Sequence, residues 1–125
     1  MKVQRDGRDF KVVVAPDGEG LVSHAGSALL AQVAEKTGLT GALSSGLSGL
    51  KQRRSGHDQG RVIRDLAVML ADGGDCLGDL GALGDQEPLF GDVASASTAF
   101  RLIDRIACDP AGLERLRVHA RACGR

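Results

Sequence analysis

The stretch DQGRVIRDLAVMLADGG, residues 58–74, decides the fold class. Its apolar residues recur every three or four positions, which is the spacing of one face of an α-helix. They are Val62, Ile63, Leu66, Met69 and Leu70. We expect this face to meet a core, and Arg61, Arg64 and Asp65 to lie on the solvent side. Asp58 stands where a helix N-cap carboxylate belongs, so the stretch predicts a helix from Gln59 to Asp72.

Upstream of this helix, similar spacing predicts two shorter helices. The first is capped by Ser23 and runs to Thr37, and Gly38 stands where a left-handed residue commonly follows a helix. Its inward side chains are expected to be Leu29, Leu30, Val33 and Ala34. The second begins after Thr40 and ends near Leu50, and it is weakened by several glycines.

Downstream, the pattern predicts a weak helix over residues 75–83 and a single turn over 86–90. Asp75 is expected to cap that weak helix. Ser95 or Ser97 caps the next one, whose apolar stripe is Ala99, Leu102, Ile103 and Ile106. Asp109 and Pro110 begin a last helix with an N-cap carboxylate followed by proline. The buried side of that helix is expected to be Leu113, Leu116 and Ala120.

Before the helices, residues 10–23 predict a β-hairpin. The three valines at 12–14 favour a strand, Pro16-Asp17-Gly18 supplies turn chemistry, and Leu21-Val22 forms a return strand. The predicted organisation is an N-terminal tail and hairpin over 1–23 and a helical domain over 24–125. The fold class is therefore mainly α, a short hairpin followed by five or six short helices.

The composition narrows the class of protein. A chain of 125 residues with 42% hydrophobic content can build one domain, and its formal net charge of zero gives no overall attraction to nucleic acid. Cys76, Cys108 and Cys123 are widely spaced, which favours reduced thiols over disulfides or a zinc site, and we expect Cys76 and Cys108 to be small core residues. With no signal-peptide pattern and no apolar run of membrane-span length, we predict a cytoplasmic protein with no membrane partner.

The charges are nevertheless grouped along the chain. Between residues 51 and 64 there are five Lys or Arg residues against one Asp. We predict that this block contacts DNA phosphates, although a solvated surface loop explains the charge run about as well. The candidate DNA-binding residues are Lys51, Arg53, Arg54, His57, Arg61 and Arg64.

Two other sequence patterns bear on function: a possible helix-turn-helix corner and a group of aspartates. Residues 33–40 resemble the corner of a helix-turn-helix, but the helix that follows carries no Arg, Lys, Asn or Gln to read base edges. Asp72, Asp75 and Asp79 lie close in sequence, as metal-binding carboxylates would, yet helix capping explains Asp75 more simply. No phosphate-binding loop, nucleophile elbow or zinc-protease motif occurs, so we predict no catalytic residue, no metal site and no cofactor in this chain.

Several longer stretches resemble the insertion-sequence thirteen-eighty family of transposases, across roughly residues 10–125. The most specific are GHDQGRVIRDLAVMLADGGD at 56–75 and DLGALGDQ at 79–86. The others are EGLVSHAG at 19–26, AEKTGLT at 34–40 with the basic pair Arg53-Arg54, and LFGDVASASTAFR at 89–101. The resemblance implies an enzyme of DNA strand transfer whose RNase H-like domain holds two Mg²⁺ ions with Asp, Asp and Glu.

In that family the catalytic carboxylates follow the region that this chain covers, and none of its acids matches their positions. The resemblance therefore implies the N-terminal part of a transposase, which helps to bind transposon-end DNA and has no catalytic activity of its own. It implies bound Mg²⁺ only in full-length members of the family. Extra glycines at Gly46, Gly49, Gly78, Gly81 and Gly84 suggest a shortened or decaying copy. Two alternatives remain open: a helix-turn-helix-like regulator, and an interaction module that self-associates through exposed apolar helix faces.

Overall fold

The structure, a computed structural model, describes residues 2–6, 9–13, 26–50 and 56–122. In that part the chain forms seven α-helices, two short 3₁₀ helices and one pair of strands. The α-helices are α1 (Ser27–Lys36), α2 (Leu39–Leu47), α3 (Gln59–Ala71), α4 (Leu80–Gly84), α5 (Glu87–Phe90), α6 (Ala96–Cys108) and α7 (Pro110–Ala122). The 3₁₀ helices are η1 (Ser48–Leu50) and η2 (Leu77–Asp79). The prediction of a mainly helical protein is confirmed, with more helices than the five or six expected because residues 77–90 divide into several short turns.

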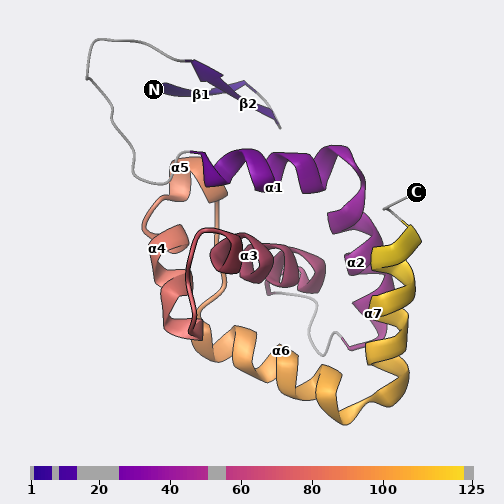
Figure 1. Cartoon of the computed structure of the whole chain (residues 1–125). Coiled ribbons are helices and arrows are strands. Elements are labelled where there is room, and N and C mark those ends of the chain that lie inside the picture. The colour runs from indigo at the N-terminus through magenta and orange to yellow at the C-terminus, as the bar shows by residue number, and fades with distance from the viewer. Residues whose placement is uncertain (1, 7–8, 14–25, 51–55, 123–125) are drawn as a thin grey trace.

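Helix α3 is the centre of the helical body. Figure 1 shows it surrounded by α1, by α2 and α7, by α6, and by α4 and α5. Its N-cap is Asp58, whose carboxylate accepts the backbone N–H of Arg61 at 2.9 Å, as the sequence predicts. Val62, Leu66, Val68 and Met69 are buried on it. Because α3 touches its neighbours on several sides, its packing sets the positions of the other helices.

The core is aliphatic, as the composition requires. Leu47 of α2 and Leu80 of α4 are its largest fully enclosed side chains. Around α3, the buried set also includes Leu83, Leu89, Phe90, Ala99, Leu102 and Ile106. Ala28 and Ala31 of α1 complete this core, so residues from five other helices share it with α3. Burial of this apolar surface is the main force that holds the helices together.

Helices α2 and α3 approach each other closely at Gly60. A Cβ atom at this position would lie 2.4 Å from the backbone nitrogen of Ser44 and 2.7 Å from the carbonyl oxygen of Thr40. No side chain fits there without separating the two helices. The Ser44 hydroxyl also donates to the Asp58 carboxylate at 2.5 Å, so the residue that caps α3 is also bonded to α2. Nothing in the periodicity of the sequence indicates this role for Gly60.

The buried faces of α1 and α3 differ from the predictions. On α1 the side chains of Leu29, Leu30 and Val33 are about half exposed, and the face toward the core consists of Ser27, Ala28, Ala31 and Ala34. Small side chains allow α1 to lie close to α3, so the larger apolar residues point away. Leu70 of α3 is likewise exposed.

The C-terminal helices begin where the sequence predicts. Ser95 accepts the backbone N–H of Thr98 at 3.3 Å, and Asp109 accepts that of Ala111 at 3.1 Å. The expected burial of Leu113 and Ala120 on α7 is wrong: both are exposed. α7 packs on α2 with other side chains: His119 lies against Gly46, and the buried residue of α7 is Gly112.

The expected burial of the two cysteines is also wrong. Cys76 lies at the start of the η2 turn and Cys108 at the end of α6, and both thiols are exposed. Both residues stand at helix ends, where the chain turns at the surface, so their apolar character does not place them in the core.

The hairpin predicted over residues 10–23 is not supported. Two strands, β1 (Lys2–Asp6) and β2 (Asp9–Val13), pair antiparallel, with Val12 opposite Val3. The valine strand therefore pairs with an upstream segment, whereas the predicted turn and return strand lie in residues 14–25, outside the described part. The predicted N-cap at Ser23 is wrong, because α1 begins at Ser27 with Gly26 as its N-cap. Strand propensity identified β2, but propensity does not say which of its two edges finds a partner.

Two leucines one turn apart on α3 provide a test of the core. We expect Leu66→Ala, at a buried position, to lower the free energy of unfolding by about 2–5 kcal/mol. Leu70→Ala removes the same atoms from a position that is 59% exposed, and it should change stability by less than about 1 kcal/mol. Urea denaturation followed by circular dichroism measures both. Equal losses for the two variants would contradict this assignment of the inner face of α3.

Candidate nucleic-acid interface

The basic segment predicted to bind DNA begins directly after η1. Lys51, Arg53 and Arg54 lie in residues 51–55, outside the part of the chain that the structure describes. The structure does describe both ends of this segment, at Leu50 and at Gly56. The residues around Leu50 and Gly56 therefore show which side chains border the segment at each end.

At the upstream end, two arginines from the C-terminal helices bond to backbone oxygens. The Arg105 guanidinium on α6 donates to the Leu50 carbonyl at 3.2 Å, and that of Arg115 on α7 donates to the Gly46 carbonyl at 3.3 Å. The Arg115 guanidinium also pairs with Asp109 at 2.8 Å. The sequence shows a basic block near its C-terminus, but it does not reveal that α6 and α7 bring arginines beside the start of the 51–55 segment.

At the downstream end, His57 and Arg61 lie together. His57 is partly buried, with its Nδ1 atom 3.6 Å from the Asp92 carboxylate. Arg61, on the first turn of α3, is exposed, and its guanidinium donates to the Phe90 carbonyl at 3.4 Å. They line a surface pocket of about 260 Å³ together with Asp58, Asp65 and Asp92. The acids reduce the positive potential here, so Arg61 is the cation best placed for a phosphate at this end.

The prediction that Arg64, one of the candidate DNA-binding residues, faces solvent is wrong. Arg64 is 6% exposed, and its Nε and Nη2 atoms donate to one Asp65 carboxylate oxygen at 2.9 and 2.6 Å. Its Nη1 atom donates to the Glu35 carboxylate on α1 at 2.5 Å. Helical spacing places charged residues outside unless they have partners within the protein. Here the partners are an adjacent acid and one on another helix, so the charge is buried.

Asp65, also predicted to face solvent, is 2% exposed. Burial raises the pKa of the Asp65 carboxyl above its ordinary value of 3.8, and the Arg64 guanidinium partly offsets this rise. At a pH between 3.8 and the raised pKa of the folded state, the Asp65 carboxyl holds a proton in the folded chain that it has released in the unfolded chain. Asp65 therefore makes stability fall as the pH rises through that window. The buried carboxylate depends on Arg64 for compensation of its charge.

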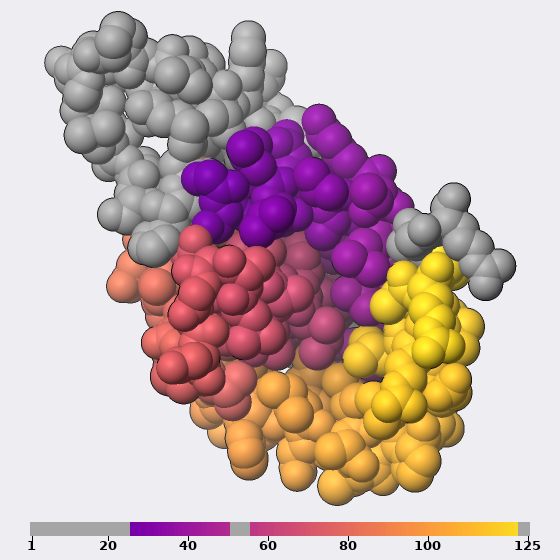
Figure 2. Space-filling view, viewed as in Figure 1, coloured from indigo at the N-terminus to yellow at the C-terminus, as the bar shows by residue number. Residues whose placement is uncertain are grey.

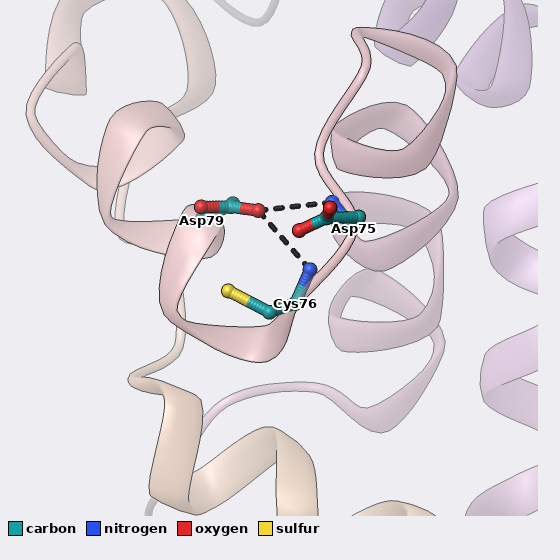
Figure 3. A group of neighbouring side chains, drawn as sticks. All are labelled: Asp75, Cys76 and Asp79. Atoms are coloured by element: carbon teal, nitrogen blue, oxygen red, sulfur yellow. Dashed lines mark hydrogen bonds between the residues drawn. The ribbon is translucent and has the colours of Figure 1, made fainter.

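The acidic loop after α3 is held by its own hydrogen bonds (Figure 3). One Asp79 carboxylate oxygen accepts the backbone N–H groups of Asp75 and Cys76 at 2.9 and 3.1 Å. These bonds lower the pKa of the Asp79 carboxyl, so its stabilising contribution is lost as the pH falls through that lowered value. The prediction that Asp75 caps this turn is wrong: Cys76 is the N-cap, and Asp79 reaches back to the preceding backbone.

Asp75, Cys76 and Asp79 could each offer one ligand atom to a metal, and these atoms lie within 4.8 Å of one another. Asp75 and Cys76 are exposed, and capping accounts for the position of Asp79. Asp72, at the end of α3, accepts a hydrogen bond from the Ser27 hydroxyl at the start of α1. Among the described residues, Asp72 and Asp79 therefore have structural partners, and no three carboxylates come together.

Helix α2 occupies the place of a recognition helix after the corner at Gly38. Gly38 has φ +77°, the left-handed conformation expected there, and Ala34 is buried at the corner. α2 packs against both α3 and α7. Its exposed positions are Gly41 and Ser45, followed by Ser48 and Gly49 of the next turn. None of these side chains can form the bidentate contacts by which proteins read bases.

The comparisons with known proteins identify the class. The sequence matches the family described as "Transposase DDE domain group 1" over residues 4–121. The chain therefore belongs to this transposase family. No curated protein and no solved structure matched the sequence. No helix in the described part is long and apolar enough to cross a membrane.

Arginines one turn apart on α3 separate the structural role from the surface role. Arg64→Ala leaves Asp65 buried without its partner, and we expect a loss of about 3–5 kcal/mol in the free energy of unfolding. Arg61→Ala, at an exposed position, should change it by less than about 0.5 kcal/mol. The double change Arg64→Met/Asp65→Leu removes both charges and should recover most of the loss. Equal, small effects of Arg64→Ala and Arg61→Ala in urea denaturation would show that Arg64 is solvated.

Proposed function

We propose that this chain is the helical N-terminal part of an insertion-sequence transposase of the thirteen-eighty family and that it helps to bind transposon-end DNA. The observation that carries the proposal is the placement of cations at both ends of the basic 51–55 segment. Arg105 lies at its upstream end, 3.2 Å from Leu50, and Arg61 is exposed beyond its downstream end. A strand that follows the segment would meet positive side chains along its path.

The binding mode that we propose is contact with phosphates and not reading of bases. α2 offers only glycine and serine to solvent, whereas the candidate cations belong to the 51–55 segment of the sequence and to the first turn of α3. Phosphate contacts of this kind gain free energy from the release of counterions and are largely independent of sequence. Asp58 and Asp92, which line the pocket beside Arg61, oppose an anionic ligand, so we expect low affinity.

We further propose that the chain has no strand-transfer activity by itself. Metal-dependent phosphodiester chemistry needs carboxylates that hold two metal ions close together. Asp65, Asp72 and Asp79 are each engaged in an ion pair or hydrogen bonds of the fold, as described above. On this proposal the family's Asp, Asp and Glu belong to a catalytic domain that follows this region, and Mg²⁺ binds there.

A helix-turn-helix-like regulator is the second candidate, because the α1–α2 corner has the expected left-handed glycine. The exposed face of α2 weighs against it, because this face carries only glycine and serine and a recognition helix needs side chains that bond to base edges in the major groove. We therefore prefer the transposase hypothesis, in which the 51–55 segment and the arginines at its ends make the contact.

DNA binding is tested by its salt dependence. With Arg64 buried, the block of residues 51–64 retains four Lys or Arg residues, so neutralisation of about four phosphates predicts a log–log salt slope near −3.6. Arg53→Ala/Arg54→Ala should reduce the steepness of this slope by about two units. Fluorescence anisotropy with a duplex of the transposon end, repeated with an unrelated duplex, measures both affinity and specificity.

The matched control removes two positive charges elsewhere. Lys36 on α1 and Arg117 on α7 are exposed, so Lys36→Ala/Arg117→Ala makes the same change in net charge. We expect this control to alter the slope by less than about half a unit. If no binding is seen at low salt, or if the two double variants weaken binding equally, the 51–55 segment is not the contact.

Activity gives a separate test. Purified chain incubated with Mg²⁺ or Mn²⁺ and a labelled transposon-end duplex should neither nick nor join it. If cleavage occurs, and if it is lost in Asp72→Asn or Asp75→Asn while circular dichroism stays unchanged, then these acids are catalytic and the proposed division of function is wrong.

A further inference from the structure

The pocket at the start of α3 is lined by charged groups of both signs. One of its walls is a single face of α3 and its cap, because the four residues there stand at positions i, i+3, i+4 and i+7: Asp58, Arg61, Val62 and Asp65. The rest of the lining includes His57 and Asp92, whose side chains pair with each other at 3.6 Å. The volume of about 260 Å³ is below the roughly 300–1,000 Å³ typical of ligand pockets, so this pocket suits a small molecule.

Arg61 stands about one helical turn from both carboxylates on this wall but pairs with neither. Spacings of three and four residues allow such a pair on the surface of a helix. Within the described ranges, the Arg61 guanidinium forms no ion pair, and its hydrogen bond is the one that it donates to the Phe90 carbonyl at 3.4 Å. A guanidinium has five N–H donors, so most of them are left for a ligand.

The two carboxylates on this wall are each bonded through one oxygen only, within the part of the chain that the structure describes. Oδ1 of Asp58 accepts the Arg61 backbone N–H and the Ser44 hydroxyl. Oδ1 of Asp65 accepts both bonds from Arg64. Neither Oδ2 atom has a donor there or is enclosed by protein atoms, although Asp65 is only 2% exposed. A nearly buried carboxylate oxygen without a donor is costly, so the pocket presents two acceptors to a ligand that carries N–H groups.

A ligand with charge of one sign does not suit this arrangement. The carboxylates repel an anion, and Arg61 repels a simple cation. The acids of the pocket are not grouped as metal ligands are: among the described residues, the atoms that come within 4.8 Å of one another are those of the separate loop at residues 75–79. Opposite charges that line one pocket without pairing are instead complementary to a ligand that carries both charges.

We propose that this pocket binds a small zwitterion of the α-amino acid class. The carboxylate of the ligand pairs with Arg61, because a guanidinium holds a carboxylate through two parallel N–H bonds. Its ammonium group has three donors and bonds to Oδ2 of Asp58 and of Asp65. The ligand thereby fills the gap that separates Arg61 from both acids. The buried residues Val62 and Ala94 line the same pocket, which favours an amino acid whose side chain is small and apolar.

Arg61 also belongs to the DNA contact that we propose above. An amino acid and a DNA phosphate would use the same free N–H groups of its guanidinium, so the two ligands exclude each other at this residue. The pocket ligand does not rest on the DNA contact, because its test contains no DNA. Failure of either proposal is therefore seen separately from failure of the other.

The two halves of the ligand test the bridging directly. Glycine, methylammonium and acetate are added separately to isotope-labelled chain at neutral pH and constant ionic strength, and the amide signals of residues 56–65 and 92–94 are followed by proton–nitrogen NMR. Glycine should bind with a dissociation constant of about 1–10 mM, because charges in an open pocket stay partly hydrated. Each half makes only one of the two charged contacts and should bind at least about tenfold more weakly. Glycine that binds no more tightly than methylammonium or acetate overturns the proposal.

Substitutions on the α3 wall separate the two contacts. Arg61→Gln removes the partner of the ligand carboxylate, so glycine should bind at least about tenfold more weakly, at the level of methylammonium. Asp58→Asn keeps a side chain that caps α3 but loses the negative charge, and it should weaken glycine at least about fivefold. If either variant binds glycine as tightly as the original chain, with an unchanged circular dichroism spectrum, the proposal is wrong.

The matched control removes an exposed arginine far from the pocket. α7 lies across the body from α5, whose Phe90 carbonyl holds Arg61, as Figures 1 and 2 show. Arg117→Gln on α7 makes the same chemical change as Arg61→Gln and should leave the dissociation constant of glycine within about twofold. Equal losses in these two variants would show that glycine responds to net charge and not to the pocket, and would overturn the proposal.

Discussion

The buried ion pair between Arg64 and Asp65 is the constraint on which the arrangement of helices depends. Both residues belong to the central helix α3, and both are almost completely withdrawn from water. An unpaired charge in that position is very costly, so the two charges must stay together. The third partner, Glu35, lies on α1, so the same guanidinium that neutralises Asp65 also fixes α1 against α3. The Ser27–Asp72 hydrogen bond joins these two helices at the opposite end of α1.

This use of charge within the fold limits what remains for function. Arg64, Asp65, Asp72 and Asp79 all have partners that hold helices or turns in place, although their spacing in the sequence suggests a DNA contact or a metal site. The positive side chains that we propose for a ligand are those of the 51–55 segment and of its ends. A transposase region built in this way would contact the phosphate backbone of DNA. It would depend on other parts of the protein for strand transfer.

The sequence predicted the elements that local interactions determine. The Asp58 cap, the length of α3 and the starts of α6 and α7 follow from residues within one turn of each other. The faces of α1 and the burial of Arg64 were missed because they depend on contacts between helices. Glu35 lies 29 residues from Arg64, and no periodicity joins the two. In the same way, the sequence alone indicates only that Gly60 lowers the helix propensity of α3. The close approach of α2 explains why no larger residue fits there.

Arg64 is part of the core, whereas we propose that neighbouring cations face a ligand. The Nε–H groups of arginines give separate signals in a proton–nitrogen NMR spectrum when hydrogen bonds protect them from exchange. We predict a protected Arg64 signal at neutral pH, because its Nε atom donates to Asp65 at 2.9 Å, and no shift of that signal on addition of transposon-end DNA, while signals of residues 56–61 move. A rapidly exchanging Arg64 group, or one that shifts with DNA as much as Arg61 does, would contradict this account.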